Sequence, residues 1–595
     1  MQQNKINLVI NPKHSSESNE TRLVNINPAS YLVSSNVKVD LSEINNLIKK
    51  ARKSFRLKKY LSAKNQFIKI FEKRKDLEIA LLISDCFTAM REFKKAIHFF
   101  EKNLPYFENN GHYWGILALH NYASEDFEGA AGAAYNAIEK HNLKLLELWK
   151  IFVHASKKIE RVDVLYDTCR NHLPDLKHAS FDDIAQNPYV IDGYLTACYE
   201  KNKKEGWEFI LNSGINIENV YKLGEVAGVI CASIASLLPD NQEKSKLALS
   251  WLTKARDLDP TNNYIRWNLS HSQLQEGLID EGIINYETRF LWEKFPSYKR
   301  TFKKPVWHPN APKDAKILVW YEQGIGDQIR FLSALKLFKK KFPNLIYETG
   351  ERTFSLIKNS FDDIEVRKST MNDDLTTTIE DFDYHIPAGT LFFYMVGQKS
   401  KELKEQNSSI FHPFLIVDKL RKQYWEHKLH SQSSKPKIGI CWTSEMLNKI
   451  RNPNYTSLEK WQELLNHNKF SFINLTYSVS MDELRSKGAI TQNFLDTEFL
   501  DQKDDLDGVA ALISNLDYVI STSSSPSMFA SALGIPTLIF GRMSFDYLGR
   551  SKKFVQHPIF KNTKLYPILD AESDKYIVPE ITKFLEKEFL ETTEA

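Results

Sequence analysis

The feature that most constrains this chain is a spacing of small and apolar residues that recurs through its first half. In each copy a small residue lies three positions after one residue of a helix face and four positions before another. Four copies follow one another every 32 to 34 residues between residues 60 and 170, and two further copies, 34 residues apart, lie between residues 245 and 286. In six copies that position is occupied by Ala63, Ala96, Ala130, Val162, Ala248 and Gly282. Small side chains let two helices approach closely, and residues four apart share a helix face. One helix pair cannot bury its apolar face alone, so we expect successive pairs to stack into a superhelix.

The repeat resembles the tetratricopeptide repeat (TPR), whose second helix has a small residue, an aromatic residue four positions later and a closing proline. Pro260, preceded by Asp257, Leu258 and Asp259, matches that closing signature. Residues 171–240 keep helical character but lose the register. Such a scaffold predicts a concave groove for an extended peptide. The alternative, that the repeats only cap, dimerise or support the second half, stays open because fold alone does not determine function.

Charge and cysteine content narrow the classes of function. Lys and Arg number 79 and Asp and Glu 75, so the near balance gives no electrostatic case for a nucleic-acid or membrane-surface binder. The five cysteines are scattered and form no C-x-x-C pair, which favours free thiols in a reducing compartment. Residues 1–20 lack the apolar stretch of a signal peptide, and no run approaches a membrane span. We therefore expect a cytoplasmic protein without a membrane span.

Prolines mark a change of organisation near residue 300. Pro305, Pro309 and Pro312 follow a basic cluster and interrupt the helical pattern, which indicates a linker whose charges face solvent or, alternatively, contact phosphate. The predicted divisions are a flexible segment at 1–40, TPR-like repeats at 41–295, a linker at 296–315, and two α/β lobes at 316–430 and 431–595.

The first α/β lobe opens with a strand, a glycine turn and a helix. Residues 316–321 are a short apolar run typical of a buried parallel strand, and 329–341 form an amphipathic helical pattern. Between them lies G-x-G-D, formed by Gly324, Gly326 and Asp327. Glycines let backbone approach a ligand, and a helix N-terminus attracts anions, so the turn is a candidate phosphate cradle. Further strands are predicted at 345–348, 364–366 and 383–386.

A second alternation of strands and helices begins at residue 437. The strand predicted at 437–442 ends at Thr443 and Ser444, and further strands are predicted at 470–475, 518–521 and 537–540. The strand at 518–521 runs into a hydroxyl-rich turn before a helix at 528–533, with hydroxyls from Ser523, Ser524, Ser525 and Ser527. Such a turn can donate hydrogen bonds to phosphate, although ordinary N-capping requires only one of these serines. Two facing lobes leave a cleft at the carboxyl ends of their strands, where ligands usually bind.

Several segments resemble one family in the same order. They are residues 286–290, 305–307 and 321–331, then Ile438–Trp442, Leu516–Ser521 and Ala532–Pro536. The chain is similar to bacterial TPR glycosyltransferase-like proteins, which are related to heptosyltransferases and more distantly to O-linked N-acetylglucosamine transferases. The resemblance implies a TPR-like α-solenoid followed by a GT-B glycosyltransferase with two Rossmann-like lobes, the first for the acceptor and the second for a nucleotide-diphosphate-sugar.

The resemblance also implies roles for particular residues. Asp327 matches the turn aspartate that is the candidate general base, since a carboxylate beside the acceptor hydroxyl can take its proton. Lys449 and Arg451 would neutralise the leaving diphosphate. The implied donor side further includes Gly324, Gly326, Thr443, Ser444, Ser523, Ser524, Ser525 and Ser527, and the acceptor side Gln323 and Gln328. No metal or other cofactor is expected, and no H-E-x-x-H motif occurs.

Two hypotheses follow from these patterns. The first is a glycosyltransferase that uses a nucleotide-sugar donor and a protein or glycan acceptor presented by the repeat groove, with a homodimer as a further option. The second is a non-catalytic scaffold with a degenerate sugar-nucleotide-binding domain. The intact G-x-G-D turn favours the enzyme. The scaffold is favoured by a departure: where the family often has Asp-Thr or Asp-Ser and then a histidine, this chain has Ser523, Ser524 and Met528.

Overall fold

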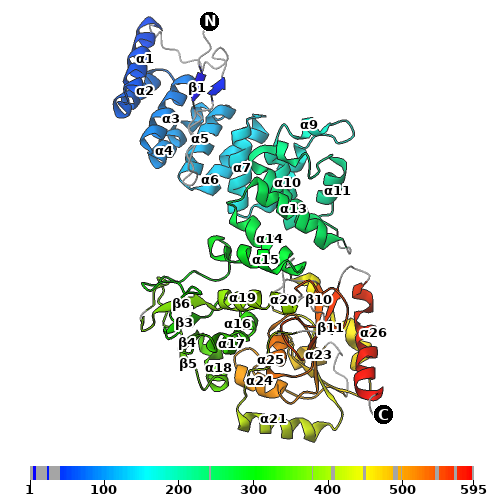
Figure 1. The fold of residues 1–595 in the computed structure, drawn as a ribbon. Helices are drawn as coiled ribbons and strands as arrows, with labels where there is room; N and C mark the ends of the chain where they lie inside the picture. The colour runs from blue at the N-terminus through cyan, green and yellow to red at the C-terminus, as the bar shows by residue number, and fades with distance from the viewer. Residues whose placement is uncertain are drawn as a thin grey trace. The chain divides into compact units, whose positions relative to one another are not determined.

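The computed structural model divides the chain into two compact units, Met1–Leu237 and Leu238–Ala595 (Figure 1). The structure describes residues 5–7, 23–25, 41–239, 243–377, 379–403, 409–445, 451–486, 493–497, 499–542, 548–568 and 573–591. Of the segment 1–40, the described parts are two short antiparallel strands, β1 (Lys5–Asn7) and β2 (Leu23–Asn25).

The first unit is built from helical hairpins with the predicted period. Its regular pairs are α1 (Leu41–Arg56) with α2 (Tyr60–Lys73), α3 (Leu77–Met90) with α4 (Phe93–Asn103), α5 (Gly111–Ala123) with α6 (Phe127–Tyr135), and α7 (Leu146–Lys158) with α8 (Val162–Asn171). Ala63, Ala96 and Ala130 lie on the second helix of their pairs and are completely buried. The small residues are therefore where two helices pack closely, as the spacing predicts.

The helices that follow α8 in this unit are less regular. They are α9 (Phe181–Ile184), α10 (Pro188–Glu200), α11 (Glu205–Asn212), η4 (Val220–Val226) and α12 (Ala227–Leu237). The stretch Val220–Leu237 is long and apolar enough to cross a membrane by length and composition alone. It is interrupted at Gly224, whose φ of 66° and ψ of −139° are not helical. Ile230 and Ile234 of α12 are completely buried, as in the core helix of a globular unit.

The second unit begins with three further repeat helices, α13 (Lys244–Leu258), α14 (Asn263–Gln275) and α15 (Ile279–Tyr286). Gly282 of α15 faces α14 so closely that a Cβ there would stand 2.6 Å from the Leu274 side chain. A glycine is required at this small position because no other side chain fits between the two helices. These last repeat helices belong to the same compact unit as the two sheets.

The first sheet has four parallel strands in the order β5-β4-β3-β6. Its strands are β3 (Ile317–Trp320), β4 (Leu345–Thr349), β5 (Glu365–Lys368) and β6 (Tyr384–Pro387). The helices around it are α16 (Ile325–Leu332), α17 (Leu335–Lys339), α18 (Phe354–Ser360) and α19 (Ala388–Gln398). All four predicted strands are present. The helix predicted at 329–341 is two helices, and the first of them begins inside the glycine turn.

The segment predicted as a linker packs against the outer face of this sheet. Thr301 and Val306 form isolated bridges to Thr376 and His385. Phe302 packs on a small buried cluster of that face, and Arg300 donates to the buried Glu348 at 2.7 Å. Within the basic cluster, Arg300 is therefore part of the packed protein rather than a solvated connector.

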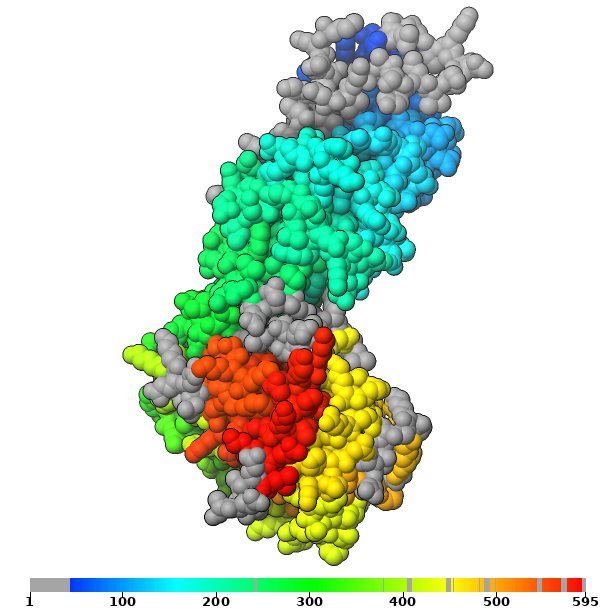
Figure 2. All heavy atoms as spheres, turned by 90° about the vertical axis from the view of Figure 1, so that its right-hand side faces the viewer, coloured from blue at the N-terminus to red at the C-terminus, as the bar shows by residue number. Residues whose placement is uncertain are grey.

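The second sheet has six strands in the order β11-β12-β10-β9-β7-β8, and only β11 runs antiparallel. They are β7 (Lys437–Cys441), β8 (Ser471–Asn474), β9 (Tyr518–Thr522), β10 (Thr537–Arg542), β11 (Val555–Gln556) and β12 (Thr563–Ile568). Four of these were predicted, whereas β11 and β12 were not. One face is covered by α26 (Ser573–Glu586), the red helix on the surface in Figure 2, whose Ile577, Ile581 and Leu585 are buried.

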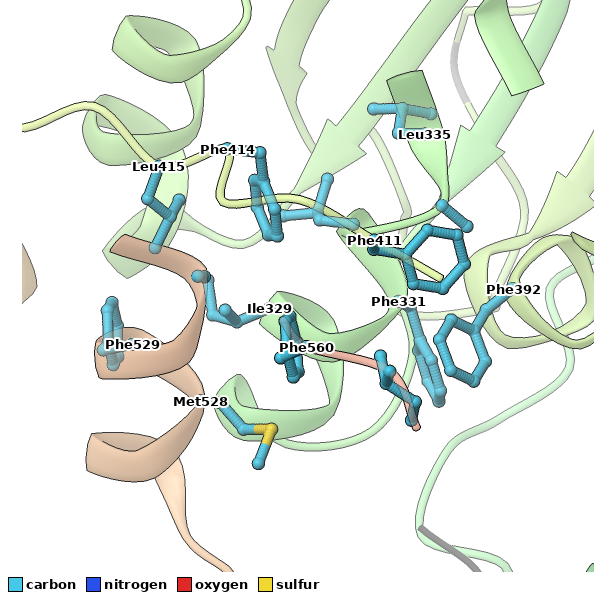
Figure 3. Close-up of a cluster of buried hydrophobic side chains, with 14 of the residues drawn as sticks. Ile329, Phe331, Leu335, Phe392, Phe411, Phe414, Leu415, Met528, Phe529 and Phe560 are labelled. Atoms are coloured by element: carbon cyan, nitrogen blue, oxygen red, sulfur yellow. The ribbon is translucent and has the colours of Figure 1, made fainter. Parts of the chain in front are cut away.

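The opposite face of the second sheet packs toward the first sheet. The helices here include α24 (Leu506–Ile513) and α25 (Ser525–Leu533), with α21 (Lys419–Gln432) beside α24. One continuous buried cluster joins residues of both sheets. Figure 3 shows Ile329 and Phe331 of α16 gathered with Met528 and Phe529 of α25 and with Phe560. This shared apolar core holds the two sheets together.

Candidate functional site

Each sheet has one point at which the order of its strands reverses. In the first sheet, β4 and β5 lie on one side of β3 and β6 on the other. In the second sheet, β8 lies on one side of β7, and β9, β10 and β12 on the other. Ligands of open α/β sheets bind outside the carboxyl ends of the strands at such points. The glycine turn follows β3, while residues 442–444 follow β7 and the serine turn follows β9, so the predicted site segments all leave from these two places.

The glycine turn leads directly into α16. Gln323 has a left-handed φ of 62°, and Gly324 is the N-cap residue of the helix. Gln328 N–H donates to the Gly324 carbonyl at 2.9 Å, which closes the first helical turn. The first N–H groups of a helix have no partner within it. The turn therefore presents backbone donors and the positive end of a helix dipole to the space above the sheet.

Asp327 lies in this first turn and is fixed by a neighbour on the same helix. Arg330 Nη1 donates to Asp327 Oδ1 at 2.7 Å. The Asp327 side chain is 25% exposed and that of Arg330 only 7%. The second oxygen, Oδ2, faces the turn, because a Cβ at Gly324 would stand 3.7 Å from it. One carboxylate oxygen is thus occupied, and the other lies beside the glycine with part of the side chain open to solvent.

The two glutamines predicted for the acceptor side point in different directions. Gln323 Nε2 donates to the hydroxyl of Tyr286 at 2.7 Å. Gln328 is buried, and its Oε1 accepts hydrogen bonds from the hydroxyls of Thr349 at 3.4 Å and Thr353 at 3.3 Å. Gln328 therefore joins α16 to the end of β4, and Gln323 lies at the turn itself.

The hydroxyls of the serine turn are largely used within the turn. Ser524 N–H donates to Ser527 Oγ at 3.1 Å, and Ser527 Oγ donates back to the Ser524 carbonyl at 2.7 Å. Ser524 Oγ lies 3.1 Å from Ser521 Oγ and 3.5 Å from Cys441 Sγ. Ser523 is exposed and Ser525 is half-buried. Hydrogen bonds within the turn thus account for Ser524 and Ser527, whereas Ser523 is the most exposed serine of the turn and Ser525 is half-buried, as Ser524 is.

Met528 belongs to the core rather than to the turn. It is 1% exposed and lies in the buried cluster between α16 and α25 (Figure 3). The position at which the family often has a histidine is therefore filled here by an apolar side chain in contact with other apolar side chains.

The glycine turn and the serine turn lie against each other. A Cβ built on Gly326 would stand 3.5 Å from the backbone nitrogen, the Cα and the Oγ of Ser525. Helices α16 and α25 are in contact. The N-termini of two helices from different sheets thus open on the same space, which concentrates positive potential and N–H donors there.

The loop after β7 returns to the carboxyl ends of the neighbouring strands. Thr443 is half-exposed, and Ser444 Oγ lies 3.2 Å from the hydroxyl of Tyr477. Arg451 is exposed, and Lys449 lies outside the described residues. Asn454 anchors the loop: its carbonyl accepts from Thr522 Oγ1 at 3.0 Å.

Arg542 is a basic residue at this site that the sequence analysis missed. It is the last residue of β10, and its backbone N–H donates to Asn454 Oδ1 at 2.9 Å. The sequence feature that could have identified Arg542 is its place at the end of a buried strand, β10. This strand runs parallel to β9, the strand that precedes the serine turn. Among the described residues, no group of three or more His, Cys, Asp or Glu side chains is arranged to hold a metal ion.

A buried ion pair behind the glycine turn was also missed. Arg289 Nε and Nη2 donate to the two carboxylate oxygens of Glu322, each at 2.8 Å. Both side chains are fully buried. The signal was present in the family segments 286–290 and 321–331, which contain one partner each, but nothing in the sequence pairs residues so far apart.

No family model matches this chain. Protein FlbA of Caulobacter vibrioides is 26% identical over 289 residues, which cover 46% of this chain and 47% of FlbA. The match therefore spans about half the length of that curated relative.

Similar solved structures include proteins of both kinds that the resemblance names. The ADP-heptose LPS heptosyltransferase II of E. coli is 14% identical with a TM-score of 0.32, covering 47% of this chain and all (100%) of that one. The TPR protein YrrB, with an unusual peptide-binding site, is 13% identical with a TM-score of 0.26, covering 33% of this chain and 95% of that one. At TM-scores of this size, neither decides what this chain does.

Proposed function

We propose that this chain is a GT-B glycosyltransferase that moves a sugar from a nucleotide-diphosphate-sugar to an acceptor hydroxyl. The observation that carries the proposal is the meeting of the two turns, with Gly326 against Ser525 and Asp327 beside them. Two helix N-termini that open on one space favour a diphosphate, and a fixed carboxylate one residue away favours proton transfer from a hydroxyl.

The proposed reaction assigns a task to each side of the site. Asp327 takes the proton of the acceptor hydroxyl through Oδ2, while Arg330 keeps Oδ1 in place. The acceptor oxygen attacks the anomeric carbon, and the bond to the diphosphate breaks. Negative charge then grows on the leaving diphosphate, where the N-terminus of α25 and nearby cations such as Arg451 stabilise it. We place the acceptor, a protein or a glycan, along the repeats, and the reaction in the cytoplasm.

The test begins with a thermal-shift screen of the full chain against ADP, GDP, UDP and CDP and their sugar conjugates, with and without divalent metal. A nucleotide at about 100 times its dissociation constant stabilises the folded state by about 2.7 kcal/mol. We expect a shift with one nucleotide. If a well-folded sample shows no shift with any of them, the proposal fails.

Replacing the proposed base separates binding from chemistry. Asp327→Asn should keep the nucleotide shift and lower transfer by about 100-fold or more, the usual contribution of a general base. The matched control is Asp482→Asn, because Asp482 also pairs with an arginine three residues on, at 2.8 Å, and both of these side chains are exposed. Unchanged transfer in Asp327→Asn would remove this carboxylate from the mechanism.

A second candidate function is a non-catalytic scaffold that senses a sugar nucleotide. It is favoured by the buried Met528 and by the internal hydrogen bonds of Ser524 and Ser527. This candidate predicts a nucleotide shift without turnover in the presence of any acceptor.

A further inference from the structure

The residues just before the glycine turn are held by the last repeat helix and the segment that follows it. Glu322 accepts two hydrogen bonds from Arg289 and a third from the Gly389 N–H, at 2.8 Å to Oε1. Gly389 is the second residue of α19, so Glu322 ties together the end of the repeats, the end of β3 and the start of the helix after β6. A Cβ at Gly389 would stand 2.5 Å from Glu322 Oε1, which leaves no room for a side chain.

The geometry of this pair is what a buried ion pair requires. Two buried charges are stable only with well-placed hydrogen bonds, and removal of one partner leaves an uncompensated charge. Burial alone would lower the pKa of Arg289, but the charge of Glu322 and the nearby Tyr286 outweigh it, so the pKa is raised. The guanidinium also lies 4.6 Å from the Tyr286 ring centroid and 4.4 Å from that of Phe290. The hydrogen bonds to Glu322 and the two aromatic rings therefore fix the position of the Arg289 guanidinium.

Gln323, the next residue, is held from the same segment. Its φ of 62° is unfavourable for a residue with a side chain, and such strain persists only where surrounding contacts enforce it. Its backbone N–H donates to Ser297 Oγ at 2.6 Å, and its side chain donates to the Tyr286 hydroxyl at 2.7 Å. The strained residue directs the chain from β3 into Gly324 and Asp327.

We propose that Tyr286 and Arg289, at the end of the last repeat, are positioning residues for the glycine turn and so for the carboxylate of Asp327. The contacts of Tyr286 and Arg289 fix the position of the backbone at residues 322–324. That backbone in turn determines where Asp327 lies relative to an acceptor hydroxyl. The inference rests on the proposed glycosyl transfer for its catalytic meaning. It makes the last repeat a working part of the transfer site as well as a surface that receives an acceptor.

The experiment uses the full chain with Tyr286→Phe and Arg289→Lys. Tyr286→Phe removes one hydroxyl, and Arg289→Lys keeps the charge but loses the paired hydrogen bonds. The matched controls are Tyr424→Phe, since Tyr424 is an exposed tyrosine, and Arg421→Lys, since Nη1 of the surface residue Arg421 donates to both carboxylate oxygens of Asp505, at 2.6 and 2.7 Å.

Two readouts are measured on all four variants. The first is hydrogen–deuterium exchange of peptides that cover residues 321–330, which should be faster in Tyr286→Phe and Arg289→Lys than in the controls. The second is turnover of the nucleotide-sugar found by the thermal-shift screen. Here kcat should fall by about 10- to 100-fold, the effect of a small misplacement, while the nucleotide shift stays as in the wild type.

The outcomes separate the two proposals. Unchanged exchange at residues 321–330 in both variants, with wild-type melting temperature, would show that the repeat end does not hold the turn. Faster exchange with unchanged kcat would overturn the positioning role in catalysis. A wild-type chain that binds no nucleotide-sugar refutes the proposed function instead, and the exchange data still decide whether Tyr286 and Arg289 hold the turn.

Discussion

Gly326 and Ser525 are in contact across two helices that start from different sheets: a Cβ at residue 326 would lie 3.5 Å from the Ser525 backbone nitrogen. That distance is ordinary van der Waals contact, so one methyl group fits, and we expect a branched side chain to press on Ser525. The closeness of the two turns therefore depends on a very small residue at position 326.

This contact predicts different results for two substitutions of Gly326. Gly326→Ala should be neutral or stabilise the chain by about 0.5–1 kcal/mol, because alanine costs less entropy in a helix than glycine. Gly326→Val should destabilise it by about 1–3 kcal/mol through overpacking and should abolish the nucleotide shift. Urea unfolding measures the stability of both variants, and the thermal-shift assay measures whether each variant still binds the nucleotide. Equal stability of both variants would mean that the turns do not meet as described.

Met528 offers a test of the departure from the family. Because it is buried among apolar side chains, Met528→His should cost about 2 kcal/mol or more, since an imidazole would be buried without a designed partner. Met528→Leu, the control of similar volume, should cost less than about 1.5 kcal/mol. If the histidine variant is as stable as the leucine variant in urea, the site has room and partners for a polar group.

Buried histidines predict a loss of stability in mild acid. Burial, with Arg330 and Arg550 nearby, lowers the pKa of His557 to about 3, and its Nδ1 accepts from the Ile559 N–H at 2.9 Å. The unfolded chain binds a proton near pH 6.5 and the folded chain does not. The contribution of neutral His557 to the free energy of unfolding is therefore fully present above pH 6.5. It decreases as the pH falls toward 3, by about 1.36 kcal/mol per pH unit.

The measurement compares wild type with His557→Asn, which keeps an acceptor and cannot titrate. Urea unfolding at pH 7.5 and pH 5.0 should show a smaller loss in the variant, by about 2 kcal/mol. His271 and His385, each with a pKa lowered to about 4 mainly by burial, act in the same direction and remain in both proteins. An identical loss in variant and wild type would exclude a neutral buried His557.

The ion pair between the repeat end and the first sheet predicts where the chain can be cut into fragments that fold. A fragment of residues 238–595 keeps Arg289 with Glu322 and should fold cooperatively. A fragment of residues 296–595 leaves the buried Glu322 carboxylate without its cation, which should cost about 3–5 kcal/mol. Thermal melts followed by circular dichroism compare them. Equal melting temperatures would show that the sheets do not depend on the repeat end.

The strands that border the site could be predicted because each is a short apolar run next to a turn. The runs predicted at 316–321, 345–348 and 437–442 all form strands close to their predicted bounds. Strand β12 was missed because Thr563 and Lys564 interrupt its apolar character and only the neighbouring strand β10 makes it a sheet member. The roles of Asp327, the serines and Arg451 stay predictions, since no ligand contact tests them.

By itself the sequence determined the helical period, the positions of the small residues, and the two turns that follow buried strands, because each depends on residues within about one helix turn or strand of one another. Only the tertiary structure decided which of these meet. The contact of Gly326 with Ser525 and the pairing of Arg289 with Glu322 join distant segments, and they exist because a shared apolar core brings α16, α25 and the last repeat together. A local sequence pattern carries no information about such distant partners. Once the chain has folded, each buried charge needs its partner, because an unpaired buried charge is strongly destabilising.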